Sequence, residues 1–310
     1  MTSTTSILPF ILTFLIVLFL YLHILNEFKT SNKLNIYEID YVSNGQLQEI
    51  CELKQPFIFD PTTEIMETSN ELLDHLTNDE QSDMKLYNSA DHEFVFLNSK
   101  SAIKMLQSSD GGYYTQYNWD FVRENSIDFT STLSTYWRPY FTLHTYMDVR
   151  AGCKDVTSQP RYHKHNRMFL LVMSGTLQVK MTPHDYSKFL KNQTNYEYME
   201  HCSNVDFWGD HVDKNIKFVE FTIHAGRALF IPPYWCFSVK YGANTILYEV
   251  FYMSILNTVL HVPDYAIHFV QKNNSSEKLL EDYIEPPHDV DAMGDNKINE
   301  TDDHPTTCEE

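Results

Sequence analysis

Short apolar runs recur at regular spacing through the second half of this 310-residue chain, and they set its fold class. Each run is typical of one or two strands: residues 140–149, 167–182, 218–223, 228–231, 236–241 and 245–254. Ser174-Gly175 splits the second run as a hairpin turn would. The series predicts an antiparallel sandwich or barrel. The 20 Tyr and 20 Phe agree, because aromatic residues favour strands, and we expect a mainly β fold with flanking helices.

The first half of the chain mixes both element types. Apolar positions at helical spacing predict helices within 35–55 and 63–78, and a short helix at 99–106. Apolar runs at 55–61 and 92–97 predict strands, the first of them bracketed by prolines.

A long polar insertion interrupts the strand series at residues 185–210, and we expect it to form a surface excursion with a short helix at 185–191. Its aromatic residues are either an exposed binding surface or the contact that packs the insertion onto the strands, and we expect the second. They are Tyr196, Tyr198, Phe207 and Trp208.

A run of 19 uncharged residues begins at Ile7 and ends at Leu25. At about 1.5 Å per helical residue it reaches roughly the hydrocarbon thickness of a bilayer. A cleavable signal would need a basic residue ahead of the run and small residues after it, and neither is present. We therefore expect an uncleaved single-pass membrane anchor. A signal peptide and a buried soluble helix are the alternatives.

The side of the membrane stays open. Lys29 and Lys33 follow the apolar run with no basic side chain ahead of it, which favours a cytosolic domain. Four Asn-x-Ser/Thr triplets, at Asn192, Asn273, Asn274 and Asn299, are glycosylation acceptors and point the other way. Such triplets also arise by chance in a chain this rich in Asn, Ser and Thr.

The net charge argues against some classes of partner, and the cysteine spacing argues against a zinc site. The net charge is −19, and 12 acidic against 2 basic residues fall in 273–310, so we expect an acidic disordered tail there. Nucleic acid is excluded as an expected partner, because phosphate binding needs a basic face. The five cysteines lack zinc-site spacing. We expect free thiols, with a disulfide between Cys153 and Cys202 as the alternative in an oxidising compartment.

Three stretches carry a resemblance to a known superfamily: 111–118 (GGYYTQYN), 159–175 and 226–239 (GRALFIPPYWCFSV). The third keeps a Gly, here Gly226, a Pro six residues later, and aromatic residues just before a ligand position. Together the stretches resemble the JmjC and cupin-like hydroxylases. The resemblance implies a double-stranded β-helix, a cupin or jelly-roll-like barrel, behind the amino-terminal anchor.

The resemblance also gives the domain layout. We expect an anchor at 1–26, a linker at 27–34, a JmjC/cupin-like domain at 35–272 and the tail at 273–310. Within the domain, 35–135 would hold helices and strands, 136–256 the barrel and 257–272 a final helix.

Active members of this superfamily hold Fe(II) with an H-x-D/E pair and a distal His, which leaves room for 2-oxoglutarate and oxygen. Here the distal position is Phe237, and a phenyl ring cannot bind a metal. Aligned without a gap, the first pair falls on Tyr162 and Lys164; shifted by one residue, it falls on His163 and His165. The lysine that grips 2-oxoglutarate in many JmjC domains is replaced by Leu177.

His163 and His165 are therefore weak metal candidates. Residues two apart on a strand share a face, which suits two ligands, but a catalytic site generally has three. His144 or His224 could supply the third. The alternative, which we favour, is that His163 and His165 are solvated or hydrogen-bonded at a strand edge.

In place of a metal site we expect apolar filling of the barrel by Trp235, Cys236, Phe237, Leu177, Met168 and Phe169. The expected function is a membrane-anchored, non-catalytic domain with a binding or structural role and a protein partner. No catalytic residue, cofactor or metal is expected. One alternative is an Fe(II)- and 2-oxoglutarate-dependent hydroxylase that uses His163, His165 and another group. The other is a metal-free, small-ligand-binding cupin.

Overall fold

The computed structural model describes residues 4–90, 93–108, 111–125, 129–191, 193–196, 198–209 and 212–274. Its helices are α1 (Thr4–Glu27), α2 (Asn44–Cys51), α3 (Thr63–Asn78), α4 (Ser99–Gln107), α5 (Trp119–Glu124), α6 (Phe129–Tyr136), η1 (His184–Phe189), α7 (Ile255–Leu260) and α8 (Val262–Asn274). Its strands are β1 (Tyr37–Ile39), β2 (Phe57–Phe59), β3 (Asp83–Asn88), β4 (Phe94–Asn98), β5 (Tyr113–Thr115), β6 (Thr142–Gly152), β7 (Arg161–His163), β8 (Arg167–Ser174), β9 (Thr176–Thr182), β10 (Gln193–Asn195), β11 (Glu200–Cys202), β12 (Val219–His224), β13 (Ala228–Ile231), β14 (Cys236–Tyr241) and β15 (Thr245–Ser254).

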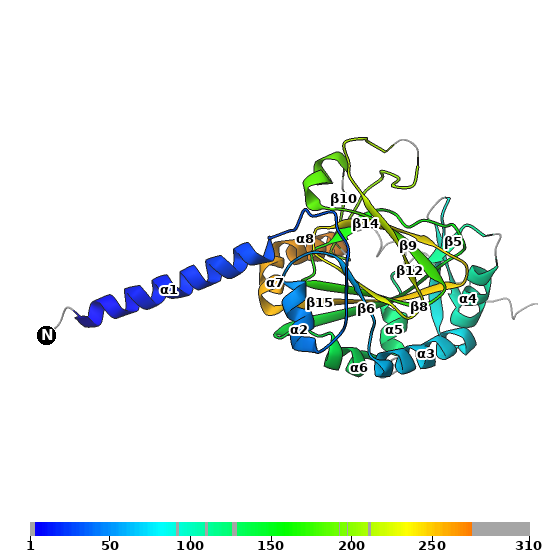
Figure 1. Ribbon diagram of the computed structural model, residues 1–310, viewed down its shortest axis with the longest axis horizontal. Helices are drawn as coiled ribbons and strands as arrows, with labels where there is room; N and C mark the ends of the chain where they lie inside the picture. The colour runs from blue at the N-terminus through cyan, green and yellow to red at the C-terminus, as the bar shows by residue number, and fades with distance from the viewer. Residues whose placement is uncertain are drawn as a thin grey trace, which may run out of the picture. The chain divides into compact units, whose positions relative to one another are not determined.

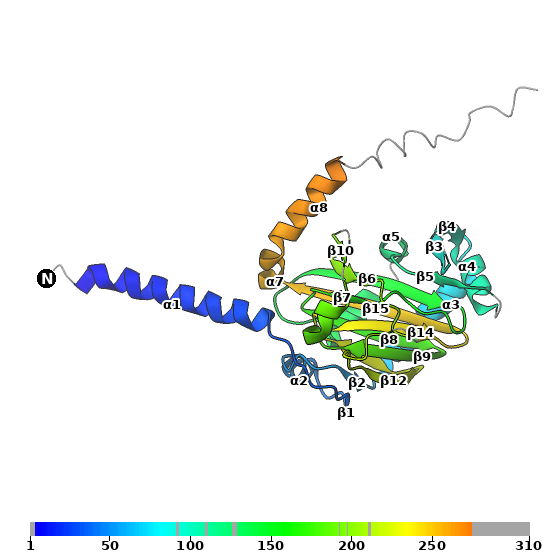
Figure 2. The same ribbon diagram turned by 90° about the horizontal axis from the view of Figure 1, so that it is seen from above.

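These strands form two sheets (Figures 1 and 2). The larger has nine strands in the order β1-β2-β13-β8-β15-β6-β5-β3-β4, and the smaller has six in the order β10-β11-β7-β14-β9-β12. Among the described residues, β1 and β2 are parallel and the other paired strands are antiparallel. The mainly β fold with flanking helices is therefore confirmed.

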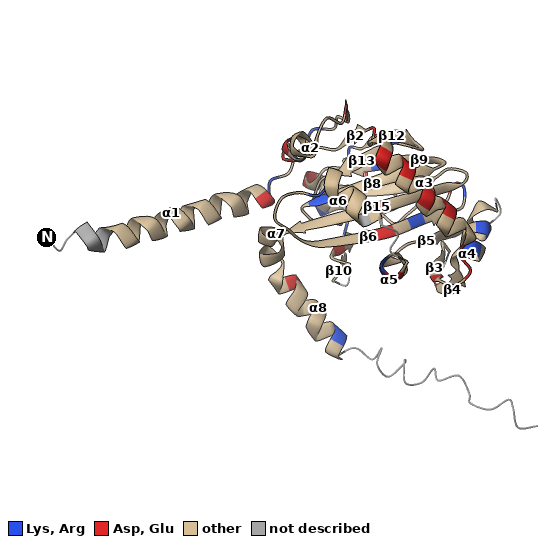
Figure 3. Cartoon of the chain, turned by 90° about the horizontal axis from the view of Figure 1, so that it is seen from below, with Lys and Arg blue, Asp and Glu red and all other residues tan. Residues whose placement is uncertain are grey.

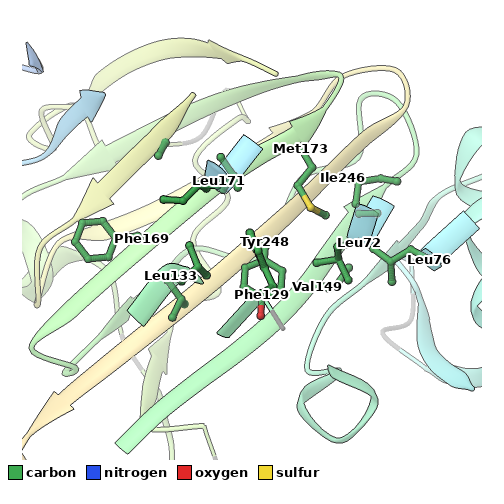
Figure 4. Packing of buried hydrophobic residues seen from close by; sticks show 14 of the residues in the cluster. Leu72, Leu76, Phe129, Leu133, Val149, Phe169, Leu171, Met173, Ile246 and Tyr248 are labelled. Atoms are coloured by element: carbon green, nitrogen blue, oxygen red, sulfur yellow. The ribbon is translucent and has the colours of Figure 1, made fainter. Parts of the chain in front are cut away.

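Alternation along the strands of the large sheet sorts their side chains onto two faces. On β8, Phe169 and Leu171 face the helices and belong to the same core cluster as Leu72 of α3 and Leu133 of α6 (Figure 4). This outer core stabilises the sheet by about 1.5–3 kcal/mol for each large side chain that it removes from water. The expectation that Phe169 fills the barrel is wrong, because its neighbours in the strand take the inner face.

The inner faces of the two sheets pack together through a second apolar core. Met168 and Leu247 come from the large sheet, and Leu177, Val179 and Phe237 come from the small one. Since these side chains interdigitate at full burial, the two sheets form a sandwich.

The insertion covers the outer face of the small sheet. Phe207 is fully buried there, and Cys236 of β14 belongs to this outer core rather than to the barrel interior as expected. The indole nitrogen of Trp208 donates to Ser238 Oγ over 2.9 Å. The expected packing role of these two aromatic residues is confirmed. The insertion also supplies β10 and β11, which its polar sequence did not predict.

Local signals explain most of the remaining elements. The predicted turn at Gly175 is confirmed: its φ is +74°, and a Cβ there would lie 2.7 Å from the Cα of Thr245. The helical prediction for 35–55 is wrong in its first half, where β1 forms. The helix α2 begins after Ser43, whose side chain accepts from the backbone N–H of Gln46.

Helix α1 is long and apolar enough to cross a membrane over Leu8–Glu27, and no part of its span is buried in the fold. A signal sequence would satisfy the same description. The four described cysteines, Cys51, Cys153, Cys202 and Cys236, are free thiols, so the Cys153–Cys202 disulfide does not form.

Parts of the other predictions lie outside the described residues. Residues 275–310 of the predicted tail are among them, with Cys308 and the triplet at Asn299, and so is Asn192. Asn273 and Asn274 are the last residues of α8.

Candidate functional site

Phe237 lies inside the sandwich. Strand β14 alternates from Cys236, so Phe237, Val239 and Tyr241 point inward, and Phe237 has an exposed fraction of 0%. Its backbone pairs in register with Arg161 of β7. The Arg161 guanidinium carbon lies 5.2 Å from the phenyl centroid, a cation–π contact. The phenyl ring of Phe237 is therefore buried in the interior and faces a cation.

His163 also points inward from β7 and is fully buried. Its Nε2 lies 3.1 Å from the backbone oxygen of Ile231, and a carbonyl can only accept, so Nε2 carries the proton. Among the described residues, Nδ1 meets no hydrogen-bond partner. Burial lowers the pKa of His163 to about 3, which keeps the ring neutral.

His165 is the second weak candidate, and it is also buried. Its ring lies 5.8 Å from that of His163 and 4.8 Å from that of Phe251. Neither of its nitrogens has a hydrogen-bond partner in the part of the chain that the structure describes. Burial holds its pKa well below the ordinary value. The expectation of solvated histidines at a strand edge is wrong, because β11 of the insertion pairs with β7 and removes that edge. The hydrogen bond of His163 was foreseen.

The other sequence candidates do not join this pair. Tyr162 points to the opposite face of β7, where it stacks on His201 at 4.5 Å. Lys164 forms an ion pair with Asp264 at 3.0 Å. His144 and His224 are both exposed.

The fit of this site to iron is poor. Among the residues that the structure describes, no three His, Cys, Asp or Glu side chains come close enough together to hold a metal ion. The guanidinium of Arg161, two residues from His163, adds a positive charge that opposes a cation. Leu177, at the expected 2-oxoglutarate position, is buried in apolar packing.

A buried charge cluster, defined by Asp148, Arg150, Arg161, Glu200 and Glu249, occupies the interior beside Phe237. Arg161 Nη2 bonds both carboxylate oxygens of Glu249 at 2.9 and 3.0 Å, and Nη1 bonds Glu200 at 3.1 Å. Arg150 Nη1 bonds Glu249 at 3.1 Å. All five side chains are at most 3% exposed. The expectation of a purely apolar interior is therefore wrong.

The cluster joins the two sheets. Asp148, Arg150 and Glu249 belong to β6 and β15 of the large sheet, whereas Arg161 and Glu200 belong to β7 and β11 of the small one. Each Arg161 contact with Glu249 therefore crosses the sandwich. Three carboxylates against two guanidinium groups leave an excess of negative charge if all are ionised. Burial raises the pKa of Asp148 to about 6 and also raises that of Glu200.

The GGYYTQYN stretch anchors one side of the cluster. The backbone N–H groups of Tyr117 and Asn118 donate to the Asp148 carboxylate at 2.8 and 2.7 Å. Gln116 accepts from Arg150, and the Tyr117 hydroxyl donates to Glu200 at 3.1 Å. The polar residues of this stretch thus have a structural role that the resemblance did not explain.

Sequence reasoning missed the cluster, because Arg161 and Glu249 lie 88 residues apart. One signal was available: Glu249 is the single charged residue of β15, whose ten residues are all buried. A charge in such a run predicts a buried partner.

A shallow, open cleft of about 780 Å³ lies outside this interior. Residues 154–160, which link β6 to β7, line it together with 203–206 and 111–112. No member of the buried charge cluster lines it.

Comparison with known proteins does not assign the chain to a family. No protein-family model matches the chain, and no curated protein matches it.

Burial of neutral His163 predicts acid sensitivity. Because its pKa is about 3 when folded and about 6.5 when unfolded, the unfolded chain binds a proton that the folded chain does not, and stability falls as pH drops below about 6.5. This costs about 2 kcal/mol of unfolding free energy between about pH 7 and pH 5. His163→Gln should reduce the measured loss by that amount in urea titrations at the two pH values. His224→Gln, at an exposed site, should leave it unchanged, and an equal loss in both variants would contradict the expectation.

Proposed function

We propose that this chain is a membrane-anchored protein with a double-stranded β-helix of the cupin and JmjC-like type, adapted for binding or support rather than for iron-dependent catalysis. The strand order supports the fold. Strands β6 to β9 and β12 to β15 pair as β6 with β15, β7 with β14, β8 with β13 and β9 with β12. This nested pairing, divided between two facing sheets, is the arrangement of a jelly-roll barrel.

Phe237 carries the argument against catalysis. The sequence resemblance aligns Phe237, the inward residue at the start of β14, with the distal ligand of the hydroxylases. Its ring is buried, packs in the inner core and lies over Arg161. The interior that would receive iron and 2-oxoglutarate thus holds a phenyl ring and an ion-pair network instead.

Membrane attachment rests on α1, whose apolar span has no residue buried inside the fold. A helix of this length and composition is stable in a bilayer, where its backbone is satisfied internally and its side chains meet lipid. The body that it would hold at the membrane has a rigid, cross-linked interior. These features fit a partner-binding or scaffolding role better than a role that requires an open catalytic cavity.

The open cleft favours a second candidate, a metal-free small-ligand protein. Its volume of about 780 Å³ lies in the range typical of ligand sites, although it is open rather than enclosed.

Turnover of 2-oxoglutarate tests the proposal. Full-length protein in detergent, supplied with Fe(II), ascorbate and 2-oxoglutarate, should form no succinate above a protein-free control. Succinate formation that His163→Ala abolishes and His224→Ala preserves would establish the hydroxylase alternative and refute a non-catalytic role.

A further inference from the structure

Six large apolar side chains gather at one end of the large sheet and remain in solvent. They come from the turn before β6, the start of β6 and the segment that follows β15, and the pairing of these two strands brings the segments together. Each is between 51% and 80% exposed. We call them the apolar patch: Tyr140, Phe141, Leu143, Ile255, Val259 and Val262.

The patch is held rigidly. Thr142 Oγ1 donates to Pro139 O at 2.7 Å, and Arg138 donates to Thr142 O at 3.2 Å. The backbone N–H of Ile255 donates to Phe141 O at 3.0 Å, which ties the turn to α7. Phe141 has a φ of +58°, a conformation that is unfavourable for a bulky residue, and its ring is 80% exposed. A fixed, strained turn that keeps a phenyl ring in water is typical of a contact surface.

The end of α1 lies against α7, the helix that carries Ile255 and Val259 of the patch. Helices α1 and α7 are in contact, and Asn257 of α7 donates to the Glu27 carboxylate at 3.3 Å (Figures 1 and 2). The apolar run of α1 ends at Leu25, two residues before this bond. If α1 spans a bilayer, α7 must therefore lie within a few ångströms of the headgroups.

The charge pattern also suits a membrane surface. The chain has 42 acidic residues, yet none falls in 138–147 or in 250–263. Helix α7 has no charged residue at all (Figure 3). Anionic headgroups therefore meet no opposing carboxylate from these two segments.

We propose that the apolar patch inserts into the headgroup region of the bilayer that α1 spans, so that the two-sheet body is seated on the membrane instead of hanging from a flexible tether. Ile255 and Val259 are four residues apart on α7 and so share one face of that helix, and Val262 opens α8 just after it. This inference rests on the proposed anchoring by α1 and adds a second contact to it.

Depth-dependent quenching tests the inference. Full-length protein with Cys202→Ser and Cys308→Ser is reconstituted into phosphatidylcholine–phosphatidylserine vesicles, and a fluorophore is attached through Val259→Cys. The matched control carries it through Val95→Cys, an exposed apolar position on β4, which lies at the far end of the body from α7 (Figure 2). Doxyl-labelled lipid should quench the label at 259 at least about twofold more than the label at 95, because interfacial segments lie about 5–10 Å into the headgroup boundary. Adding Phe141→Glu should reduce the difference.

Each other outcome is decisive. Equal quenching in protein that floats with the vesicles would refute the seating and leave the anchor intact. A label at 259 that is shielded from water but is not quenched by doxyl lipid would assign the patch to a protein partner. That result would also refute the seating on the membrane. If the wild-type chain did not float with the vesicles, both the membrane anchor and this inference would be refuted.

Discussion

Arg161→Leu should lower the free energy of unfolding by about 3–5 kcal/mol, because it leaves buried carboxylates without their shared cation. Arg161 is the side chain of β7 that bonds both Glu249 across the sandwich and Glu200 beside it. Leucine has no donor to replace these bonds. Glu249 would keep Arg150, but Glu200 would retain only the Tyr117 hydroxyl among the contacts described for it. Denaturant titration of the full-length protein in detergent, followed by circular dichroism, measures the effect.

Arg123→Leu is the matched control. Arg123 pairs with Asp120 at 2.7 Å, but both side chains are more than 75% exposed. An exposed pair contributes about 0–1 kcal/mol, so the same substitution should cost little there. Equal effects at the two positions would mean that the buried charge cluster does not hold the sheets together.

Phe237→Ala should also lower the free energy of unfolding by about 3–5 kcal/mol, since it opens a cavity in the inner core. The phenyl ring is fully buried, and its removal also deprives Arg161 of the surface over which the guanidinium lies. Differential scanning calorimetry of the detergent-solubilised chain would show this loss of stability as a lower unfolding temperature.

Phe94→Ala provides the comparison for that variant. Phe94 is 48% exposed on β4, and truncation there should cost about 1 kcal/mol or less. If Phe237→Ala were as mild as this control, the ring would not be a packing residue, and the interior would resemble a site kept open for a ligand.

The elements that were predicted best are those whose structure is determined by residues close together in the sequence. Strands β8 and β9 were predicted because their apolar runs are continuous and Gly175 marks the turn between them. Strand β3 and helix α5 were missed because both are short, and their positions depend on the pairing of β3 with β4 and β5 and on the packing of α5 against β6. The transmembrane-length helix was predicted from its uncharged run alone.

The interior was harder to predict, because its contacts join distant segments. The burial of His163 depends on β11, which the insertion places beside it almost forty residues later. The ion pair of Arg161 with Glu249 spans 88 residues and two sheets. The apolar environment of Phe237 was predicted correctly, but Arg161 beside it was not. A single sequence shows the charged residues without showing which of them meet.

The central proposal is that side chains fill the space between the two sheets, so that no iron is held there. Iron content per chain tests it most directly. The full-length protein is incubated anaerobically with Fe(II), freed of unbound metal by gel filtration and measured by plasma mass spectrometry. We predict far less than one iron per chain, and the same content in His163→Ala. One iron per chain that disappears in His163→Ala and in His165→Ala, but persists in His224→Ala, would contradict the account.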